Sequence, residues 1–509
     1  MKRNLFIGLL AALLSSCQNT EPPAPYGATP NEAQLQWHDV DFYGLVHISN
    51  VIYDKAQGYD DADLFNPKQF DAKKIVAAMK DGGMKGVVLV AKHHCGFCLW
   101  PTSTTEYSVK NSPWRDGKGD MVREFADAAR EAGLKFGVYC SPWDMNDADY
   151  GRPEYLQRYR EQLRELHTNY GDIFLSWFDG ANGGYGYYGG AKEIRKFDLE
   201  KYYEWDSTFA MVRRWQPLSA IFNGLRADVR WVGNESGIAG DPCWATYDPA
   251  PEGSAEWRPT GGQRNGKFWM PAECDVSIRP NWFYRQSQDE QVKTPDQLFD
   301  LYFVSVGRGQ AFDLGVGPDR EGMLHPNDIR SLKGLGDLLK QTFSDNYAQT
   351  ATVTVNQTRG GSKKFSAQNL IDNDKKTYWC TDDDTTEGEI TLEWPQPQAF
   401  NIVSLREYLP LGQRIDSISA EVFVGGSWQP FAKATSIGAN RLLRRELVKA
   451  DKIRIRTYGP VCPALSEIGI YKEPERIIAP EKATSLEPEA KTFNEINETN
   501  KNATKRVGL

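Results

Sequence analysis

The sequence predicts an α/β protein, a (β/α)8-type barrel followed by an antiparallel, jelly-roll-like β-sandwich. Between residues 37 and 345, short apolar runs alternate with stretches of helical period, a pattern typical of parallel strands covered by helices. From residue 346, alternating runs separated by Gly, Asp and Asn turns indicate antiparallel strands. No Gly-rich phosphate loop follows the first strand, which favours a barrel over a doubly wound sheet.

The elements of the barrel follow one another as strand, helix, strand. Apolar runs predict strands at 43–48, 86–94, 135–142 and 173–180. Helical periods lie between them at 67–83, 121–133 and 154–171. The later runs at 220–224, 229–235, 268–273 and 301–318 supply the remaining strands of the barrel.

The second unit is predicted from residues 346–473. Its strands are expected at 351–356, 389–395, 400–409, 417–425, 451–459 and 465–472. The tail at 474–509 is polar and lacks a core-forming pattern, so we expect it to be disordered. These boundaries leave a catalytic barrel at 37–345, since no internal repeat divides the chain differently.

The N-terminal residues have a pattern that is typical of an export signal. Residues 1–17, MKRNLFIGLLAALLSSC, combine a basic start with an apolar run too short to span a bilayer. The Leu-Ser-Ser-Cys ending resembles the bacterial lipobox, which predicts cleavage before Cys17 and lipidation of its sulfur; the alternative is a plain signal peptide. Residues 18–36 are expected to form a linker. The protein would be exported and lipid-anchored, in the periplasm or at the outer membrane or cell surface, and would touch the membrane only through this anchor.

Composition excludes one class of partner. A net charge of −8 and a pI near 5.5 give no basic footprint for nucleic acid. Fifteen Trp and 23 Tyr allow surfaces that stack on sugar rings, although many will be core residues. The seven cysteines after Cys17 are an odd, scattered set, so buried thiols are favoured over a disulfide framework. Cys95 and Cys98 have C-x-x-C spacing, but no second pair completes a zinc site.

Polar residues gather where the predicted strands end. In a parallel barrel, catalytic side chains project from the C-terminal ends of strands. His47 follows the first strand, His93 and His94 the second, Tyr139 lies near the end of the third, and Trp177 and Asp179 end the fourth. Asp179 closes the otherwise apolar run FLSWFDG, and a buried carboxylate is costly unless it is paired or used. These residues predict a polar pocket.

A second carboxylate has three candidates, Glu235, Glu273 and Asp275. Two carboxylates in one pocket suit glycoside hydrolysis, in which one attacks or activates water and the other protonates the leaving oxygen. Glu235 alone could equally be a solvated loop residue. For Asp275, a structural ion pair with Arg279 is the favoured interpretation.

Several motifs in one order resemble glycoside hydrolase family 29, the retaining α-L-fucosidases. They are YGLVHI, FNP (65–67), VAKHHCGFCLW, YSVKNSPW, GVYCSPWD, LSWFDGA, VRWVGNE and SIRPNWFY, and they span about residues 37–340. They look most like the subgroup acting on α-1,3/1,4-linked fucose of branched glycans. The resemblance implies that Asp179 is the nucleophile and Glu235 the general acid/base. Among the candidate carboxylates above, Glu273 is the runner-up for the acid/base.

The same resemblance implies the sugar-binding residues, which are His47, His93, His94, Tyr139, Trp177, Trp231 and Trp282. It implies a fucosylated oligosaccharide or glycoconjugate as substrate, with no cofactor and no metal in the active site. Two positions depart from the family. Cys95 stands where an Asp is common after the paired His, and Ala56-Gln57 stand where many members have a sugar-contacting Glu-Trp pair. A related sugar such as α-L-galactose is therefore an alternative substrate.

The second unit has its own resemblance. AQNLIDNDKKTYW (367–379) followed by ITLEW looks like the start of a discoidin-type domain similar to carbohydrate-binding module family 32. Such domains often hold a structural calcium ion in the loop that here contains Asp372, Asp374 and Thr377; an ordinary Asp/Asn turn is the alternative.

Two other functions stay open from the sequence. A metal-dependent barrel hydrolase could use His47, His93, His94 and Asp179 as ligands, although adjacent His residues on a strand point to opposite faces. A surface glycan-binding lipoprotein without catalytic activity is the other, and the presence of both Asp179 and Glu235 argues against it.

Overall fold

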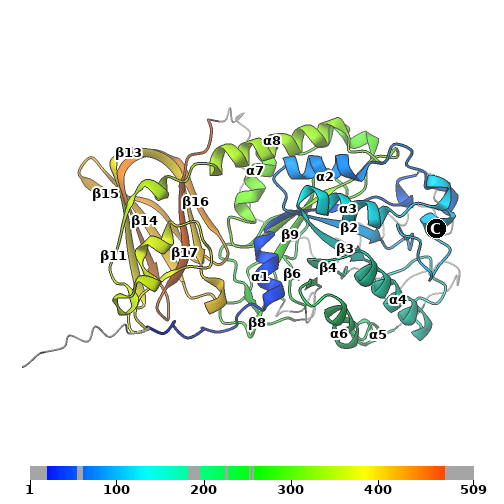
Figure 1. Cartoon of the computed structure of the whole chain (residues 1–509), viewed down its shortest axis with the longest axis horizontal. Helices are drawn as coiled ribbons and strands as arrows, with labels where there is room; N and C mark the ends of the chain where they lie inside the picture. Colours follow the sequence, from blue (N-terminus) through cyan, green and yellow to red (C-terminus); the bar gives the residue numbers. More distant parts are fainter. Residues whose placement is uncertain are drawn as a thin grey trace, which may run out of the picture.

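A computed structural model describes residues 20–475, except 54–60, 181–194, 196, 224–226, 251–253 and 255–256. Figure 1 shows a barrel wrapped by helices beside a β-sandwich. Cys17, the Ala56-Gln57 pair and residues 476–509 of the predicted tail lie outside the described residues. Within them, no helix is both long and apolar enough to cross a membrane.

In the described residues the barrel consists of eight parallel strands, which confirms the predicted fold class. They are β1 (Phe42–Val46), β2 (Gly86–Lys92), β3 (Lys135–Cys140), β4 (Leu175–Trp177), β5 (Ala220–Phe222), β6 (Arg230–Trp231), β9 (Ala272–Ser277) and β10 (Ala311–Val316). Around the barrel they follow chain order, with β10 returning to β1. A parallel bridge between Phe222 and Val229 joins β5 to the β6 side. Every residue of β1, β2, β9 and β10 is buried, as expected for strands covered on both faces.

The described helices of this unit cover the barrel. They are α2 (Ala72–Asp81), α3 (Met121–Ala132), α4 (Pro153–Asn169), α5 (Leu199–Tyr202), α6 (Trp205–Trp215), α7 (Pro295–Val304) and α8 (Pro326–Phe343). In α3 the Asp120 side chain caps the first turn by accepting from the Arg123 amide at 2.9 Å. The helix ends at Gly133, whose φ of 75° is a left-handed conformation that suits glycine. Local signals of this kind explain why the helical periods were readable in the sequence.

Two predicted strands differ from the structure. The apolar run at 268–273 is divided between β8 (Phe268–Trp269), which pairs with β7 (Thr246–Tyr247), and the start of β9. The run at 301–318 begins in the last turn of α7 and enters a strand only at β10. Phe303 is buried on the helix. Apolar composition alone cannot distinguish a buried helix end from a buried strand.

The second unit is an antiparallel sandwich around a separate apolar core. Its strands are β11 (Thr352–Val355), β12 (Trp379–Cys380), β13 (Glu387–Glu407), β14 (Ser417–Val424), β15 (Ser427–Ala434), β16 (Arg441–Tyr458) and β17 (Ala464–Tyr471). The two runs predicted at 389–395 and 400–409 are one bent strand, β13. Its register against β16 shifts between Glu393 and Gln398, where Pro395 and Pro397 cannot donate backbone hydrogen bonds.

The N-terminal segment is not a simple linker. The carbonyl of Glu21 accepts from Arg359 Nε at 2.8 Å, that of Ala24 accepts from Arg414 at 2.9 Å, and the Tyr26 amide donates to Leu411. This segment therefore runs along the sandwich (dark blue in Figure 1). It continues into α1 (Glu32–Asp39), so the boundary predicted at residue 37 falls inside a helix. The capping box at the start of α1 was a local signal that the sequence analysis did not use.

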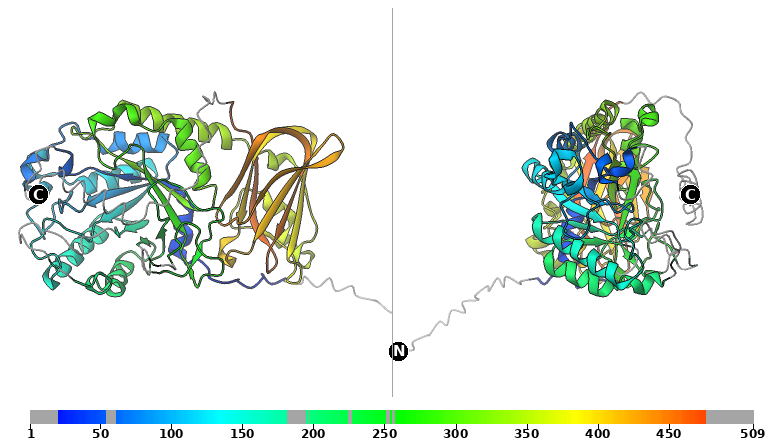
Figure 2. Two further views of the ribbon diagram at one scale, coloured as in Figure 1. Left: turned by 180° about the vertical axis from the view of Figure 1, so that it is seen from behind. Right: turned by 90° about the vertical axis from the view of Figure 1, so that its right-hand side faces the viewer.

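The sandwich packs against the end of the barrel at which the strands begin. Arg444 pairs with Asp300 near the end of α7 at 2.8 Å, and the Leu442 amide donates to the Gly307 carbonyl just before β10. Arg441 pairs with Asp241 at 2.8 Å. The left-hand view of Figure 2 shows the two units side by side. The C-terminal ends of the barrel strands therefore lie away from the sandwich.

Candidate active site

The strand ends bring the predicted histidines together. His47 directly follows β1, and His93 and His94 directly follow β2. The His47 and His93 rings lie 5.9 Å apart and those of His93 and His94 lie 4.1 Å apart, measured between centroids. Because β1 and β2 are neighbouring parallel strands, their carboxyl ends meet on one edge of the barrel. The sequence-based grouping of these three residues agrees with this geometry.

Asp179 lies two residues beyond β4, with its side chain 19% exposed. Its Oδ2 accepts a hydrogen bond from the Tyr139 hydroxyl at 2.6 Å. The same oxygen lies 3.6 Å from Nε2 of His94, while the other ring nitrogen of His94 contacts the Ser141 hydroxyl at 2.7 Å. The carboxylate is therefore oriented by a phenol on the neighbouring strand and stays accessible at the mouth of the barrel.

The three histidines are neutral near neutral pH. Burial lowers the pKa of His94 to about 3, assisted by His47 and Lys92, and burial lowers the pKa of His47 and His93 well below the ordinary value. A neutral imidazole offers one donor and one acceptor nitrogen, a combination that suits hydroxyl groups. The contact between His94 and Asp179 is consequently not an ion pair.

Stacked rings form one wall of the site. The Tyr139 ring stacks on Trp177 at 4.7 Å, and Trp177 stacks on Phe222 at 4.2 Å. On another side, Trp282 lies 5.1 Å from the His47 ring. Trp282 reaches this place because Gly315 lies beneath it, where a Cβ atom would be 2.5 Å from the indole. Flat apolar rings beside neutral donors are typical of sugar-binding sites.

Glu235 is exposed in the turn that follows β6. Asn234 shapes this turn by accepting from the Ser236 amide at 3.1 Å and donating to the Ile238 carbonyl at 2.9 Å. The negative charge of Glu235 contributes to raising the pKa of Asp275, after the larger effect of burial. Glu235 is therefore an accessible carboxyl group close to the last residues of β9.

The predicted ion pair between Asp275 and Arg279 is wrong. Asp275 is buried and accepts from Trp231 Nε1 at 2.7 Å. Arg279 lies beyond the end of β9 and pairs with Asp328 and with Asp289, each at 2.9 Å. Closeness in sequence did not translate into contact because the strand ends between the two residues.

Glu273, the alternative proton donor, is fully buried. Its Oε1 accepts from Trp177 Nε1 at 2.8 Å, and its Oε2 accepts from the Tyr43 hydroxyl. Burial raises its pKa to about 7, while these hydrogen bonds act in the opposite direction. Since both oxygens are engaged inside the barrel, this geometry favours Glu235 over Glu273 as the group that meets a substrate.

A buried acid beside Glu273 and Asp275 was not predicted from the sequence. Asp313 lies in the middle of β10 with no exposed surface, and burial together with Glu273 and Asp275 raises its pKa well above the ordinary value. The signal was present in the sequence, because Asp313 interrupts the apolar run AFDLGV much as Asp179 ends its own run.

The predicted calcium loop forms a compact turn in the sandwich. Asp372 accepts from the Thr377 hydroxyl at 2.7 Å and from the Asp374 amide at 3.0 Å. Glu467 on β17 comes close to this loop. Its Oε1 is buried without a hydrogen-bond partner, and burial and Asp372 raise its pKa to about 7. An orphaned carboxylate oxygen beside two aspartates fits a hard cation.

A complete set of metal-ligand side chains is absent from the part of the chain that the structure describes, the Asp372 loop included. In that part, no group of three or more His, Cys, Asp or Glu side chains is arranged to hold a metal ion. A cation at the Asp372 loop would therefore need hydroxyl and backbone oxygens in addition to carboxylates. The seven cysteines from Cys95 to Cys462 are free and buried, as expected for structural thiols.

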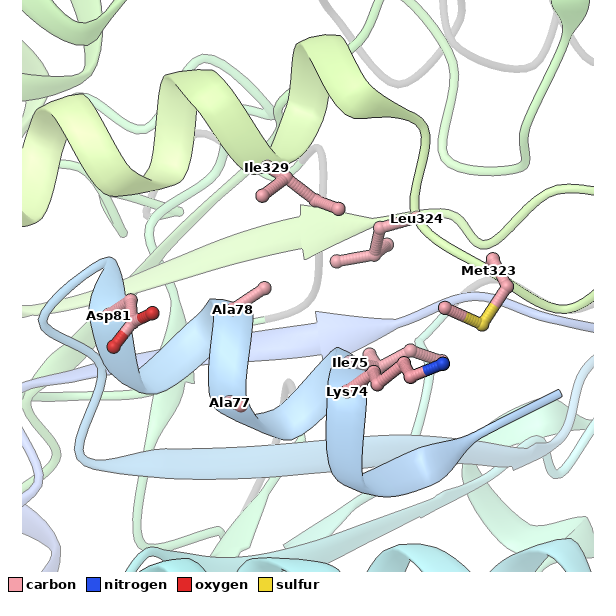
Figure 3. A pocket seen from close by; sticks show the side chains of 8 residues that line it. All are labelled: Lys74, Ile75, Ala77, Ala78, Asp81, Met323, Leu324 and Ile329. Carbon is pink, nitrogen blue, oxygen red and sulfur yellow. The ribbon is translucent and has the colours of Figure 1, made fainter.

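A separate surface cavity of about 300 Å³ lies on the outer layer of the barrel. Figure 3 shows it between α2 and the start of α8, lined by side chains such as Ile75, Ala78, Leu324 and Ile329. None of the strand-end residues described above contributes to it, so this cavity is distinct from the candidate active site.

Fold and site together define a class of protein. A parallel barrel carries an accessible carboxylate, a second accessible carboxyl group, three neutral histidines and stacked aromatic rings at its carboxyl end. This arrangement is that of a barrel hydrolase acting on a neutral, hydroxyl-rich substrate.

Comparisons with known proteins identify the family. The α-L-fucosidase family model matches residues 27–343, and the chain belongs to this family of glycoside hydrolases. It is 36% identical over 463 residues to alpha-L-fucosidase 1 of Arabidopsis thaliana, covering 89% of each chain. A glycoside hydrolase 29 family member from an unknown rumen bacterium has a TM-score of 0.77 at 39% identity, covering 89% of this chain and 79% of the other.

A third relative has been solved with a sugar bound. A Ruminococcus gnavus fucosidase of the same family, solved in complex with fucose, has a TM-score of 0.78 at 28% identity and covers 90% of this chain and 98% of the other. The predicted family and enzyme class are thus confirmed.

Proposed function

We propose that this α-L-fucosidase is a retaining exo-enzyme that removes terminal, α-1,3/1,4-linked L-fucose from branched glycans. One observation carries the proposal. Asp179 presents an accessible carboxylate whose Oδ2 is held by the Tyr139 hydroxyl at 2.6 Å, beside the neutral His94. An accessible carboxylate that is oriented by a hydrogen-bond donor is suited to attack an anomeric carbon.

The mechanism uses two carboxyl groups in two displacements. Asp179 attacks the anomeric carbon while Glu235, protonated, gives its proton to the departing glycosidic oxygen. The resulting glycosyl ester is cleaved by water, whose proton returns to Glu235 as the ester bond to Asp179 breaks. The exposure of Glu235 in the turn after β6 makes its carboxyl group accessible to both the leaving group and water.

The neutral histidines support a neutral sugar as the substrate. His47, His93 and His94 can donate to or accept from hydroxyl groups without a compensating charge. The Trp282 ring beside His47 offers an apolar surface for a sugar face. Such a pocket distinguishes a 6-deoxy sugar from its 6-hydroxy relative by whether an apolar or a polar group meets C6.

Asp179→Ala is the decisive variant. We expect hydrolysis of an aryl α-L-fucoside to fall on the order of 10⁴-fold, as for removal of a nucleophile. Azide should restore release of the aryl group and give the fucosyl azide of inverted configuration. Glu154→Gln, which changes an exposed acid in the first turn of α4 and leaves Asp179 in place, serves as the control variant. A residual rate above one tenth of wild type would contradict the nucleophile assignment.

A substrate panel tests linkage and sugar identity. Fucose release from α-1,3- and α-1,4-fucosylated trisaccharides should exceed release from an α-1,2-linked glycan by at least about tenfold, a difference of about 1.4 kcal/mol. An aryl α-L-galactoside belongs in the same panel. Preference for it over the fucoside would contradict fucose as the natural sugar.

For the sandwich we infer a discoidin-type module with a structural calcium ion at Asp372, Asp374 and Thr377. The orphaned Oε1 of Glu467 beside Asp372 supports this assignment. The ion would lower the cost of burying Glu467 and would stabilise the fold of the loop. Chelation should lower the unfolding temperature of the chain, calcium should restore it, and Glu467→Gln should remove the difference.

For localisation we infer a lipid on Cys17. The carbonyls of Glu21 and Ala24 are held against the sandwich by hydrogen bonds, which fixes the position of the chain shortly after Cys17. Only a few residues separate Cys17 from a fixed point on the sandwich, so the anchor would hold this unit within roughly 15 Å of the bilayer surface. Mass spectrometry of the N-terminal peptide from a native membrane fraction, with Cys17→Ala as control, tests the modification.

A further inference from the structure

Glu273 has no assigned part in bond cleavage, yet the burial of its carboxyl group is energetically costly. It lies on β9 with no exposed surface, in contact with Tyr43 of β1 and Trp177 of β4, and its pKa is also affected by Asp313 of β10. None of these neighbours carries a positive charge. An uncompensated buried carboxylate costs several kcal/mol, so its presence calls for a function.

The two carboxylate oxygens of Glu273 accept hydrogen bonds from two different side chains, an indole and a phenol. Oε1 accepts from Trp177 Nε1 at 2.8 Å. Oε2 accepts from the Tyr43 hydroxyl, which in turn accepts from Trp37 Nε1 at 3.2 Å. Because each oxygen has its own donor, the two contacts can be tested separately.

The contact with Trp177 leads to the nucleophile in two steps. The Trp177 indole stacks on the Tyr139 ring at 4.7 Å with 21° between the planes. Tyr139 then donates to Asp179 Oδ2 at 2.6 Å. Stacking alone allows an indole to slide or to rotate in its own plane. The hydrogen bond from its Nε1 to a fixed acceptor removes that freedom, and the Tyr139 hydroxyl keeps its direction.

We propose that Glu273 is a positioning residue for Asp179, acting through the hydrogen bond it accepts from Trp177. The inference rests on the proposed role of Asp179 as nucleophile. It assigns no proton transfer to the substrate, because Glu273 has no exposed surface.

The protonation of the cluster is consistent with this role. Burial raises the pKa of Glu273 to about 7 and that of Asp313 well above its ordinary value, and Glu273 and Asp275 add to the effect on Asp313. Tyr43 is the other titratable group that contacts Glu273, and burial keeps its hydroxyl protonated. These raised pKa values limit the negative charge inside the barrel near neutral pH, while the oxygens of Glu273 keep their donors.

Three single variants separate positioning from simple structural support. Glu273→Met removes the acceptor at similar volume, and we expect kcat on an aryl fucoside to fall about 10- to 100-fold with KM changed less. Glu273→Gln keeps an acceptor for Trp177 and should retain kcat within about threefold. The matched control Tyr43→Phe removes the donor on the other oxygen, so it should lower the unfolding temperature and leave kcat within about twofold.

A double-mutant cycle tests the route through Trp177. Trp177→Phe keeps a stacking ring but removes the Nε1 donor, so the double variant with Glu273→Met should lose little more kcat than Glu273→Met alone. Additive losses would overturn the inference, as would a folded Glu273→Met variant with wild-type kcat. If Tyr43→Phe loses as much kcat as Glu273→Met, the inference is also overturned, because a general loss of core packing would then explain both effects.

Failure of the proposed function has a different signature. If Asp179→Ala retains activity, or if azide gives no rescue, then the nucleophile assignment fails whatever the cycle shows. If azide rescues Asp179→Ala but the Glu273 and Trp177 losses are additive, then the function stands and the positioning inference alone is overturned.

Discussion

Replacing Glu273 by glutamine has a consequence for stability that can be worked out from its surroundings. Burial raises the pKa of Glu273 from an ordinary 4.5 to about 7. Between these pH values the folded chain keeps a proton that the unfolded chain releases, so folding stability falls as the pH rises through this window and stays lower above it. At 1.36 kcal/mol for each pH unit, the difference between 7 and 4.5 is about 3 kcal/mol.

Thermal unfolding of the wild type and of Glu273→Gln at pH 5 and pH 8 measures this pH-dependent contribution to stability. Glutamine does not titrate, so its unfolding temperature relative to wild type should rise by about 5 °C between the two pH values, which is what about 3 kcal/mol gives for a barrel of this size. Comparison of the two chains cancels the other titrating groups. Glu154→Gln, which changes an exposed acid in the first turn of α4, is the matched control and should show no such change.

A difference in unfolding temperature that does not change between pH 5 and pH 8 would refute this reasoning. It would mean that Glu273 has the same proton occupancy in the folded and unfolded chains. A change of opposite sign would mean that an unseen positive charge stabilises the carboxylate, and the buried cluster with Asp313 would then need another explanation.

Three further predictions follow from named contacts. Glu235→Ala should slow release of a glycan leaving group by on the order of 10²- to 10³-fold and an activated aryl group much less; equal losses in kcat/KM would contradict its role as the acid. Gly315→Ala places a Cβ 2.5 Å from the Trp282 ring, so the ring must shift; KM should rise several-fold at a cost in stability of about 1–3 kcal/mol, and an unchanged KM would mean that Trp282 does not contact the substrate. Arg279→Leu leaves Asp328 buried without its guanidinium and should cost about 3–5 kcal/mol in thermal unfolding, partly recovered by adding Asp328→Asn; no recovery would contradict the pairing.

Much of the barrel was predictable because its signals are local. The strands before His47 and before His93 are apolar runs bounded by turns, and the helix that starts after Asp120 has a cap at one end and Gly133 at the other. The rule that parallel strands present their carboxyl ends on one edge then placed Asp179 with the histidines. The misplaced strand at 268–273 shows the limit, since short apolar segments are ambiguous without their partners.

The sequence alone therefore determined which residues lie at strand ends, and with them the nucleophile candidate and the histidines. Only the tertiary structure decided which buried acids meet. Glu273 and Asp313 are 40 positions apart in the numbering and come together because β9 and β10 are paired, whereas Asp275 and Arg279 are four apart and do not pair. Strand pairing and barrel closure set these contacts, and they depend on residues far along the chain rather than on local pattern.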